Sequence, residues 1–187
     1  KKIKLNLIGK HNVLNSVAAI SLSLHIGIKI KIIKNSLKKF TGIQRRLTKI
    51  HHIKRREFFD DYAHHPTEIK SVLNSLKLTS NHKKIVSVFQ PHRYSRLRLL
   101  KNDFASAFKD SDLVVLCPVY AAGEKIDPKY KSKEFAKLIS KNSKVQVIMV
   151  KDKVSLKNFF IKNLISDELV ICMGAGSISN WLREMDL

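Results

Sequence analysis

Runs of apolar residues of strand length alternate along this chain with segments in which apolar residues recur every three or four positions. The first pattern is typical of buried strands and the second of amphipathic helices, so the alternation predicts a parallel sheet covered by helices. We therefore expect an α/β fold with a doubly wound, mostly parallel sheet of the Rossmann type. The expected strands are residues 3–8, 57–60, 84–90, 112–117, 144–150 and 168–173.

Helical spacing is clearest in residues 66–78, where Pro66 suits the first turn. Two cysteines, Cys117 and Cys172, fall inside expected strands without metal-type spacing, and we interpret them as reduced core thiols. The apolar residues expected on buried helical faces are Ile69, Val72, Leu73 and Leu76, then Ile30, Ile33, Leu37 and Phe40, then Phe104, Ala107 and Phe108, and finally Val154, Leu156, Phe159, Phe160 and Leu164.

The organisation of the chain changes near residue 41. The part before it supplies one expected strand and two expected helices, too few to close a domain, whereas the part after it supplies a nearly complete doubly wound unit. We place the boundary at Thr41–Gly42, because glycine permits the backbone conformations of a hinge. Residues 1–41 are then the end of an incomplete domain, and residues 42–187 form a domain of their own.

The start of the sequence has neither an initiating Met nor the pattern of a secretory signal, so we expect upstream residues to be missing. The most apolar helical segment runs from Val13 to Ile28 and is interrupted by polar residues. It is shorter than the ~20 residues that cross a bilayer. We expect a buried core helix there, and no membrane span.

The chain is strongly basic, with 36 Lys and Arg against 15 Asp and Glu and a net charge of +21. Such a charge favours a polyanionic partner, so a basic nucleic-acid-binding α/β domain is one hypothesis. The basic residues are spread over every expected helix and turn, however, and no zinc spacing, helix-turn-helix pattern or RNA-binding aromatic signature is present. This distribution favours a generally basic, solvated surface, which would also tolerate an anionic ligand such as a nucleotide.

Polar motifs follow several expected strands. Asn12 and Asn15 are three positions apart on a first helical turn, where two amides could contact a base edge or could simply cap the helix. Residues 60–68, with acidic, aromatic and imidazole groups, lie where parallel sheets bind ligands. Arg93 and Arg96 are spaced to grip one small anion such as an amino-acid carboxylate, although a basic surface cluster would look the same.

Three further segments give weaker signals. Residues 42–46 place two arginines near the expected boundary, and residues 120–124 form either a substrate-facing loop or an ordinary one. Residues 174–177 contain two glycines after the last strand but lack the third glycine and the later acidic residue of a dinucleotide fingerprint. We interpret that segment as a tight strand-to-helix turn, which makes an NAD-dependent oxidoreductase a weak alternative.

Taken together, six segments spread over almost the whole chain resemble the Mur ligase family. Among them, DDYAHHPTEI and FQPHRYSR are similar to the members that add L-alanine. The six segments are GKHNVLNSVAA, FTGIQRR, DDYAHHPTEI, FQPHRYSRLR, PVYAAGE and GAGSI.

The resemblance implies a cytoplasmic ligase of peptidoglycan synthesis that uses ATP and Mg²⁺. Such an enzyme phosphorylates the lactyl carboxylate of UDP-N-acetylmuramate and lets the amine of L-alanine attack the acyl phosphate. Family members have one domain each for the UDP-sugar, for ATP and for the amino acid. This chain is similar to the end of the second and to the third, so its expected partners are the missing N-terminal and central domains and two small-molecule substrates, with neither nucleic acid nor membrane.

The resemblance also implies roles for individual residues. The residues implied to bind ATP are His11, Asn12, Asn15, Arg46 and Asp61, with the asparagines at the adenine. The residues implied to bind L-alanine or UDP-N-acetylmuramate are Tyr62, His64, His92, Arg93 and Arg96, with the arginines on the alanine carboxylate. The residues implied to act in catalysis are Arg46, Asp61 and His64.

Two departures from the family pattern limit these expectations. The phosphate-binding pattern G-x-x-x-x-G-K-[ST] is absent from the sequence, and no metal ligands are expected in this part of the protein. The chain by itself should therefore be inactive. Residues 47–57 are shorter and more basic than expected, which leaves the conformation of the first hairpin open.

Overall fold

The computed structural model describes residues 3–7, 9–79, 84–165 and 167–187, and for Lys10 and His11 it describes the backbone alone. The chain divides into two compact units, Lys1–Ile43 and Gln44–Leu187. This division lies two residues further along the chain than the Thr41–Gly42 position expected from the sequence. Each unit is described separately below.

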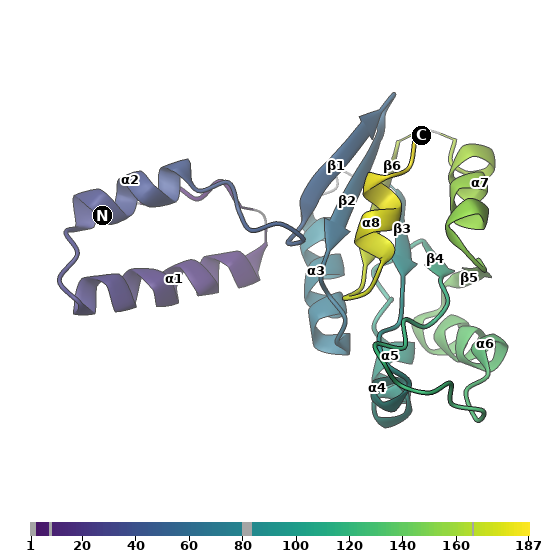
Figure 1. Ribbon diagram of the computed structural model, residues 1–187. Coiled ribbons are helices and arrows are strands. Elements are labelled where there is room, and N and C mark those ends of the chain that lie inside the picture. The colour runs from purple at the N-terminus through teal and green to yellow at the C-terminus, as the bar shows by residue number, and fades with distance from the viewer. Residues whose placement is uncertain (1–2, 8, 80–83, 166) are drawn as a thin grey trace. The chain divides into compact units, whose positions relative to one another are not determined.

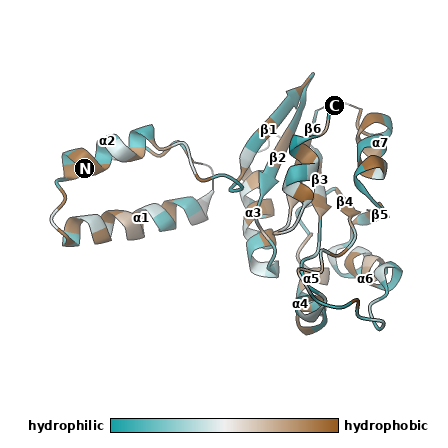
Figure 2. Ribbon diagram, in the orientation of Figure 1, coloured by the Kyte–Doolittle hydropathy of each residue, from teal (hydrophilic) through white to brown (hydrophobic). Residues whose placement is uncertain are grey.

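The first unit contains the helices α1 (Lys10–His25) and α2 (Ile30–Lys39), labelled in Figure 1. Helix α1 was expected to be buried, but hydrophobic residues recur along it (Figure 2) and several are exposed, Leu14 by 60% and Leu22 by 63%. The expectation of a core helix is wrong within this chain, because one neighbouring helix can cover only a narrow stripe of α1.

Two other expectations for the first unit also fail. Residues 3–7 of the first expected strand have no strand conformation, and residue 8 lies outside the described residues. A strand needs a neighbour to accept its backbone hydrogen bonds, and the described part of this unit supplies none. On α2, Ile33 is buried as expected, whereas Phe40 follows the end of the helix and is 40% exposed.

The second unit is built on a six-stranded sheet in the order β1-β2-β6-β3-β4-β5. All neighbouring strands are parallel except β1 and β2, which form an antiparallel hairpin. The expected α/β fold with a mostly parallel sheet is confirmed (Figure 1). The strands are β1 (Thr48–Ile53), β2 (Arg56–Asp61), β3 (Lys84–Phe89), β4 (Leu113–Leu116), β5 (Gln146–Met149) and β6 (Glu168–Met173).

The β1–β2 hairpin accounts for the segment that the sequence left open. Ile53 pairs with Arg56, so the connecting loop has two residues, and Lys54 in this loop has a φ of 57°. The pairing register shifts between Lys49 and His51, which marks a bulge on the outer strand. A bulge and charged side chains are common ways to protect an exposed sheet edge from further strand pairing.

Helices cover both faces of the sheet. One hydrophobic cluster includes residues of α3 (Pro66–Thr79), α4 (Tyr94–Leu99), α5 (Lys101–Ala105) and α6 (Ser132–Ser143). The other cluster includes residues of α7 (Lys153–Asn163) and α8 (Ile178–Arg183). Neighbouring strand residues alternate between the clusters, as the pleat of a strand requires.

Most of the expected core residues are buried, including the two free cysteines. Burial raises the pKa of the Cys117 thiol to about 12, so this thiol stays protonated and unreactive. Val154 was expected on the buried face of α7 but is 67% exposed. It lies in the first turn of the helix and does not belong to the cluster that includes Leu156 and Phe160. Among the described residues, no helix is both long and apolar enough to cross a bilayer.

Candidate functional site

The loops that follow the parallel strands meet at one edge of the sheet. The backbone N–H of Gly174, after β6, donates to the carbonyl of Asp61 at 3.2 Å. The N–H of Gln90, after β3, donates to the carbonyl of Met173 at 3.0 Å. Three segments that are far apart in the sequence are therefore joined where open α/β folds bind ligands.

Asp61 is the last residue of β2 and is 1% exposed. Its two carboxylate oxygens accept hydrogen bonds from the N–H groups of Leu47 and Ala63, each at 2.8 Å. Burial raises the pKa of the Asp61 carboxyl to about 6, although the two N–H donors and the nearby Arg46 guanidinium act in the opposite direction. The carboxylate thus holds the turn that carries Arg46 in addition to any part in ligand binding.

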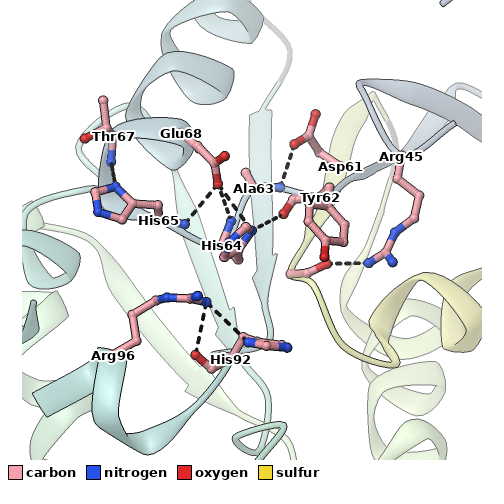
Figure 3. Close-up of polar contacts among 11 residues, drawn as sticks. Arg45, Asp61, Tyr62, Ala63, His64, His65, Thr67, Glu68, His92 and Arg96 are labelled. Atoms are coloured by element: carbon pink, nitrogen blue, oxygen red, sulfur yellow. Dashed lines mark hydrogen bonds and ion pairs between the residues drawn. The ribbon is translucent and has the colours of Figure 1, made fainter. Parts of the chain in front are cut away.

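Tyr62 and His64 lie just before α3, where Glu68 fixes the backbone (Figure 3). One carboxylate oxygen of Glu68 accepts hydrogen bonds from the N–H groups of His64 at 3.0 Å and His65 at 3.1 Å. These donors would otherwise be unpaired at the helix start. The Nδ1 atom of His64 lies 2.9 Å from the Tyr62 carbonyl oxygen, and its ring is 5.0 Å from the Tyr62 ring. The imidazole is therefore held in one orientation.

His92 and Arg96 lie opposite His64 in Figure 3, and the centroids of the two imidazole rings are 6.0 Å apart. The Nη1 atom of Arg96 is 3.3 Å from both Nδ1 and the carbonyl oxygen of His92. A guanidinium only donates, so this contact requires an unprotonated Nδ1. Burial and then the Arg96 charge lower the pKa of His92 below its usual value, which favours the same neutral form.

Arg93 precedes α4 with a φ of 70°, and its N–H donates to the carbonyl of Tyr120 at 2.9 Å. Its side chain is exposed. His92, Arg93 and Arg96 therefore have different surroundings in the structure. Arg96 is braced against His92, while Arg93 extends toward solvent from a constrained backbone.

The loop after β4 contributes two residues for which the sequence assigned no role. The ring of Tyr120 stacks on His92, with centroids 5.6 Å apart and planes 21° from parallel. Glu124 accepts hydrogen bonds from the N–H and the hydroxyl of Ser95, which lowers the pKa of its carboxyl. Both residues lie in the 120–124 segment, but only the fold shows that they support the start of α4.

The turn after β6 packs against the same cluster, and its glycines are required by close contacts. A Cβ atom at Gly174 would lie 2.7 Å from the carbonyl oxygen of Gln90. A Cβ atom at Gly176 would lie 2.5 Å from Cγ of Tyr120 and 2.6 Å from Oε1 of Gln90. The tight strand-to-helix turn expected here is present, and it leads directly into α8.

The structure brings together most of the residues singled out from the sequence. Within the second unit, the residues that gather at the sheet edge are Arg46, Asp61, Tyr62, His64, His92, Arg93 and Arg96. Asn12 and Asn15 lie on α1 of the first unit, where Asn15 is exposed. His11 also belongs to α1, but its side chain lies outside the described residues.

The cluster at the sheet edge combines positive charge with imidazole groups. The guanidinium groups of Arg93 and Arg96 can bind a small anion such as a carboxylate, and a neutral imidazole can donate one hydrogen bond and accept another. Within the described ranges, no group of three or more His, Cys, Asp or Glu side chains is arranged to hold a metal ion.

Comparison with known proteins gives a consistent picture. The family model described as "Mur ligase, glutamate ligase domain" matches residues 45–176. The UDP-N-acetylmuramate–L-alanine ligase of Pelagibacter ubique is 49% identical over 185 residues, which cover 99% of this chain and 40% of that protein. The ligase of the same name from Brachyspira hyodysenteriae is 44% identical over 174 residues, which cover 92% of this chain and 37% of that protein.

A solved structure agrees with these matches. The crystal structure of the UDP-N-acetylmuramate-alanine ligase from Thermotoga maritima has a TM-score of 0.78 and 30% sequence identity, covering 97% of this chain and 38% of that one. The chain thus spans about 40% of the length of the curated relatives it matches. These relatives are named as ligases, so the comparisons give no support to nucleic-acid binding.

Proposed function

This chain belongs to the Mur ligase family, and from that premise we propose that it is the C-terminal part of an enzyme that joins L-alanine to UDP-N-acetylmuramate. The observation that carries the proposal is the cluster in which His92 and Arg96 lie opposite His64 at the carboxyl edge of the sheet. The proposal includes ADP and phosphate as the other products and the cytoplasm as the location.

The amino acid is proposed to bind at this cluster. Arg93 and Arg96 would hold the carboxylate of L-alanine, since two guanidinium groups suit one carboxylate. His92 is kept neutral and is braced by Arg96, so its second ring nitrogen would donate a hydrogen bond to the same ligand. Tyr62 and His64 would face the reacting groups of alanine and the acyl phosphate.

Residues of each unit are proposed to take part in binding the nucleotide. Arg46 is exposed on its turn and would neutralise phosphate charge during transfer, with Asp61 beside it. Asn12 and Asn15, together with His11, would contact the adenine from the first unit, which we propose to be the end of a central ATP-binding domain. The Mg²⁺ that such phosphoryl transfer needs would be held mainly by groups upstream, since the described residues offer no cluster of three ligands.

Chemically, the chain's own residues would position reactants and stabilise charge. The carboxylate of UDP-N-acetylmuramate would first take a phosphoryl group from ATP. The amine of L-alanine, placed by the arginine pair, would then attack the carbonyl carbon of the acyl phosphate and release phosphate. Positively charged side chains stabilise the negative charge that develops in both steps.

The test uses the chain restored to full length with its own upstream coding sequence. Phosphate release is measured with ATP, Mg²⁺ and UDP-N-acetylmuramate, with and without L-alanine. Release that requires alanine and falls sharply when an acidic amino acid replaces it supports the proposal. Absence of release from an enzyme that still binds ATP would contradict it.

A further inference from the structure

The adjacent residues Arg45 and Arg46 have different surroundings. The guanidinium of Arg45 donates a hydrogen bond to the carbonyl of Gly174 and lies 4.6 Å from the centroid of the Tyr62 ring (Figure 3). Arg46 is exposed, and its guanidinium is 6.0 Å from the same ring. One arginine is therefore packed into the second unit, and the next extends from it.

The backbone around Arg46 is constrained on both sides. Arg45 has a φ of 60° and Leu47 has a φ of 47°, a region that residues other than glycine seldom adopt. Such conformations persist only where surrounding contacts enforce them. Here the N–H of Tyr62 donates to the carbonyl of Arg45 at 2.7 Å, and the N–H of Leu47 donates to Asp61 at 2.8 Å.

The side chain of Arg45 adds contacts with two more segments. Tyr62 follows β2 and Gly174 follows β6, and these two strands are neighbours in the sheet. Arg45 therefore ties the turn to both strand ends at once. Without this side chain, the turn would lose its contacts with Gly174 and the Tyr62 ring. It would keep the hydrogen bonds donated by the N–H groups of Tyr62 and Leu47 and the packing of Leu47 against the hydrophobic cluster.

We propose that Arg45 is a positioning residue, which ties the Arg45–Leu47 turn to Tyr62 and Gly174 and so fixes the direction of the Arg46 guanidinium. The inference rests on the proposed function and goes beyond it, because it assigns a task to Arg45, for which the sequence gave no role. Misplacing a charge-stabilising group by about 1 Å can reduce a rate by about 100-fold.

The kinetic test uses the full-length enzyme and alanine-dependent phosphate release. Arg45→Ala should lower kcat by about 10-fold to 100-fold, with a much smaller change in the KM for alanine. Arg45→Lys should fail to restore kcat, because an ammonium has no planar fork to stack on a ring and donate to a carbonyl. Arg55→Ala is the matched control, since Arg55 forms an exposed ion pair with Asp167. An unchanged kcat in Arg45→Ala would overturn the proposal.

A double-mutant comparison separates positioning from a general folding role. In an Arg46→Lys background, Arg45→Ala should lower kcat by a much smaller factor than in the wild type, because the group that Arg45 orients has already been altered. The same factor in both backgrounds would show that Arg45 acts independently of Arg46 and would overturn the proposal.

Amide hydrogen exchange gives a measurement that does not depend on activity. In Arg45→Ala, exchange at Tyr62 and Leu47 should become at least about 10-fold faster, because the hydrogen bonds that hold the turn open more often. Exchange in β3 should be unchanged. If the wild type shows no alanine-dependent release, the proposed function fails, and this measurement alone decides whether Arg45 holds the turn. Unchanged exchange at both amides would refute that role.

Discussion

Asp60 and Asp61 are consecutive in the sequence, yet their carboxylates point to opposite faces of the sheet. Asp60 accepts hydrogen bonds from Ser179 at 2.6 Å and Arg183 at 3.0 Å, both on α8. Asp61 accepts them from Leu47 and Ala63 on the side of the candidate site. The first aspartate therefore joins α8 to the sheet, and the second organises the turn that carries Arg46.

Asp60→Ala should lower the free energy of unfolding by about 2 kcal/mol, because Ser179 and Arg183 lose their common acceptor. Urea denaturation checks this value. Glu184→Ala is the control, since it removes a more exposed ion pair, with Lys153, that should contribute less than about 1 kcal/mol. An equal loss of unfolding free energy in the two variants would show that the buried contact contributes no more than the exposed ion pair.

The ionisation of Asp61 should make stability fall as pH rises. Its folded-state pKa of about 6 is above the ordinary value of 3.8, so the folded state binds more protons between these pH values. The contribution of Asp61 to the free energy of unfolding is then fully present below pH 3.8 and is lost as the pH rises through about 6. The full loss is about 3 kcal/mol, at 1.36 kcal/mol for each pH unit.

Unfolding free energies of the wild type and Asp61→Asn, measured at pH 4 and pH 7, check this sign. The wild type should lose stability relative to the variant on going to the higher pH. The exposed Asp103→Asn reports the general effect of removing one negative charge. A difference between wild type and Asp61→Asn that is the same at both pH values would contradict the expected shift.

Arg96→Ala and Arg93→Ala in the full-length enzyme should each raise the KM for L-alanine by about 10-fold to 100-fold, the effect of losing one charge-assisted hydrogen bond. The KM for ATP should change little. Arg98→Ala is a matched control, since Arg98 lies on α4 like Arg96 but is paired with Asp127. Initial rates at varied alanine give the values, and an unchanged alanine KM would exclude the carboxylate role.

Gly176→Ala should destabilise the second unit by about 1 to 3 kcal/mol, because the new methyl group would overlap Tyr120 and Gln90. It should also weaken alanine binding, since Tyr120 stacks on His92. Gly123→Ala is the comparison, because its Cβ would meet nothing within 4 Å and only its φ of 86° opposes the change. A larger effect of Gly123→Ala would argue against tight packing at Gly176. Thermal unfolding and the alanine KM are the two measurements.

Asn15→Ala in the full-length enzyme should weaken ATP binding more than alanine binding, because its amide is proposed to contact the adenine. The exposed Asn35→Ala on α2 is the control. Equilibrium titration with a non-hydrolysable ATP analogue measures the effect. Equal losses for both ligands would instead indicate a folding defect.

Sequence periodicity predicted five strands of the second unit and the helices between them, because these patterns record which side of each element is buried. It did not predict the outer strand β1, and it wrongly predicted a strand at residues 3–7. Strand formation depends on a partner, and a partner is not encoded in local periodicity. The exposure of Val154 has a similar cause, since helical spacing does not show where the neighbouring core ends.

The sequence by itself determined the fold class and placed polar motifs after the ends of parallel strands, which must share one edge of the sheet. Only the tertiary structure decided which neighbouring residues do different work: Arg45 is packed while Arg46 is exposed, and Asp60 binds α8 while Asp61 holds a turn. The physical reason is that a local motif does not show which distant residues it contacts in the fold. A motif fixes chemical type and spacing, whereas the roles of Arg45 and Asp60 depend on hydrogen bonds to Gly174 and Arg183, each more than 100 positions away. The role of Asp61 depends on the turn at Leu47, which the local pattern did not reveal.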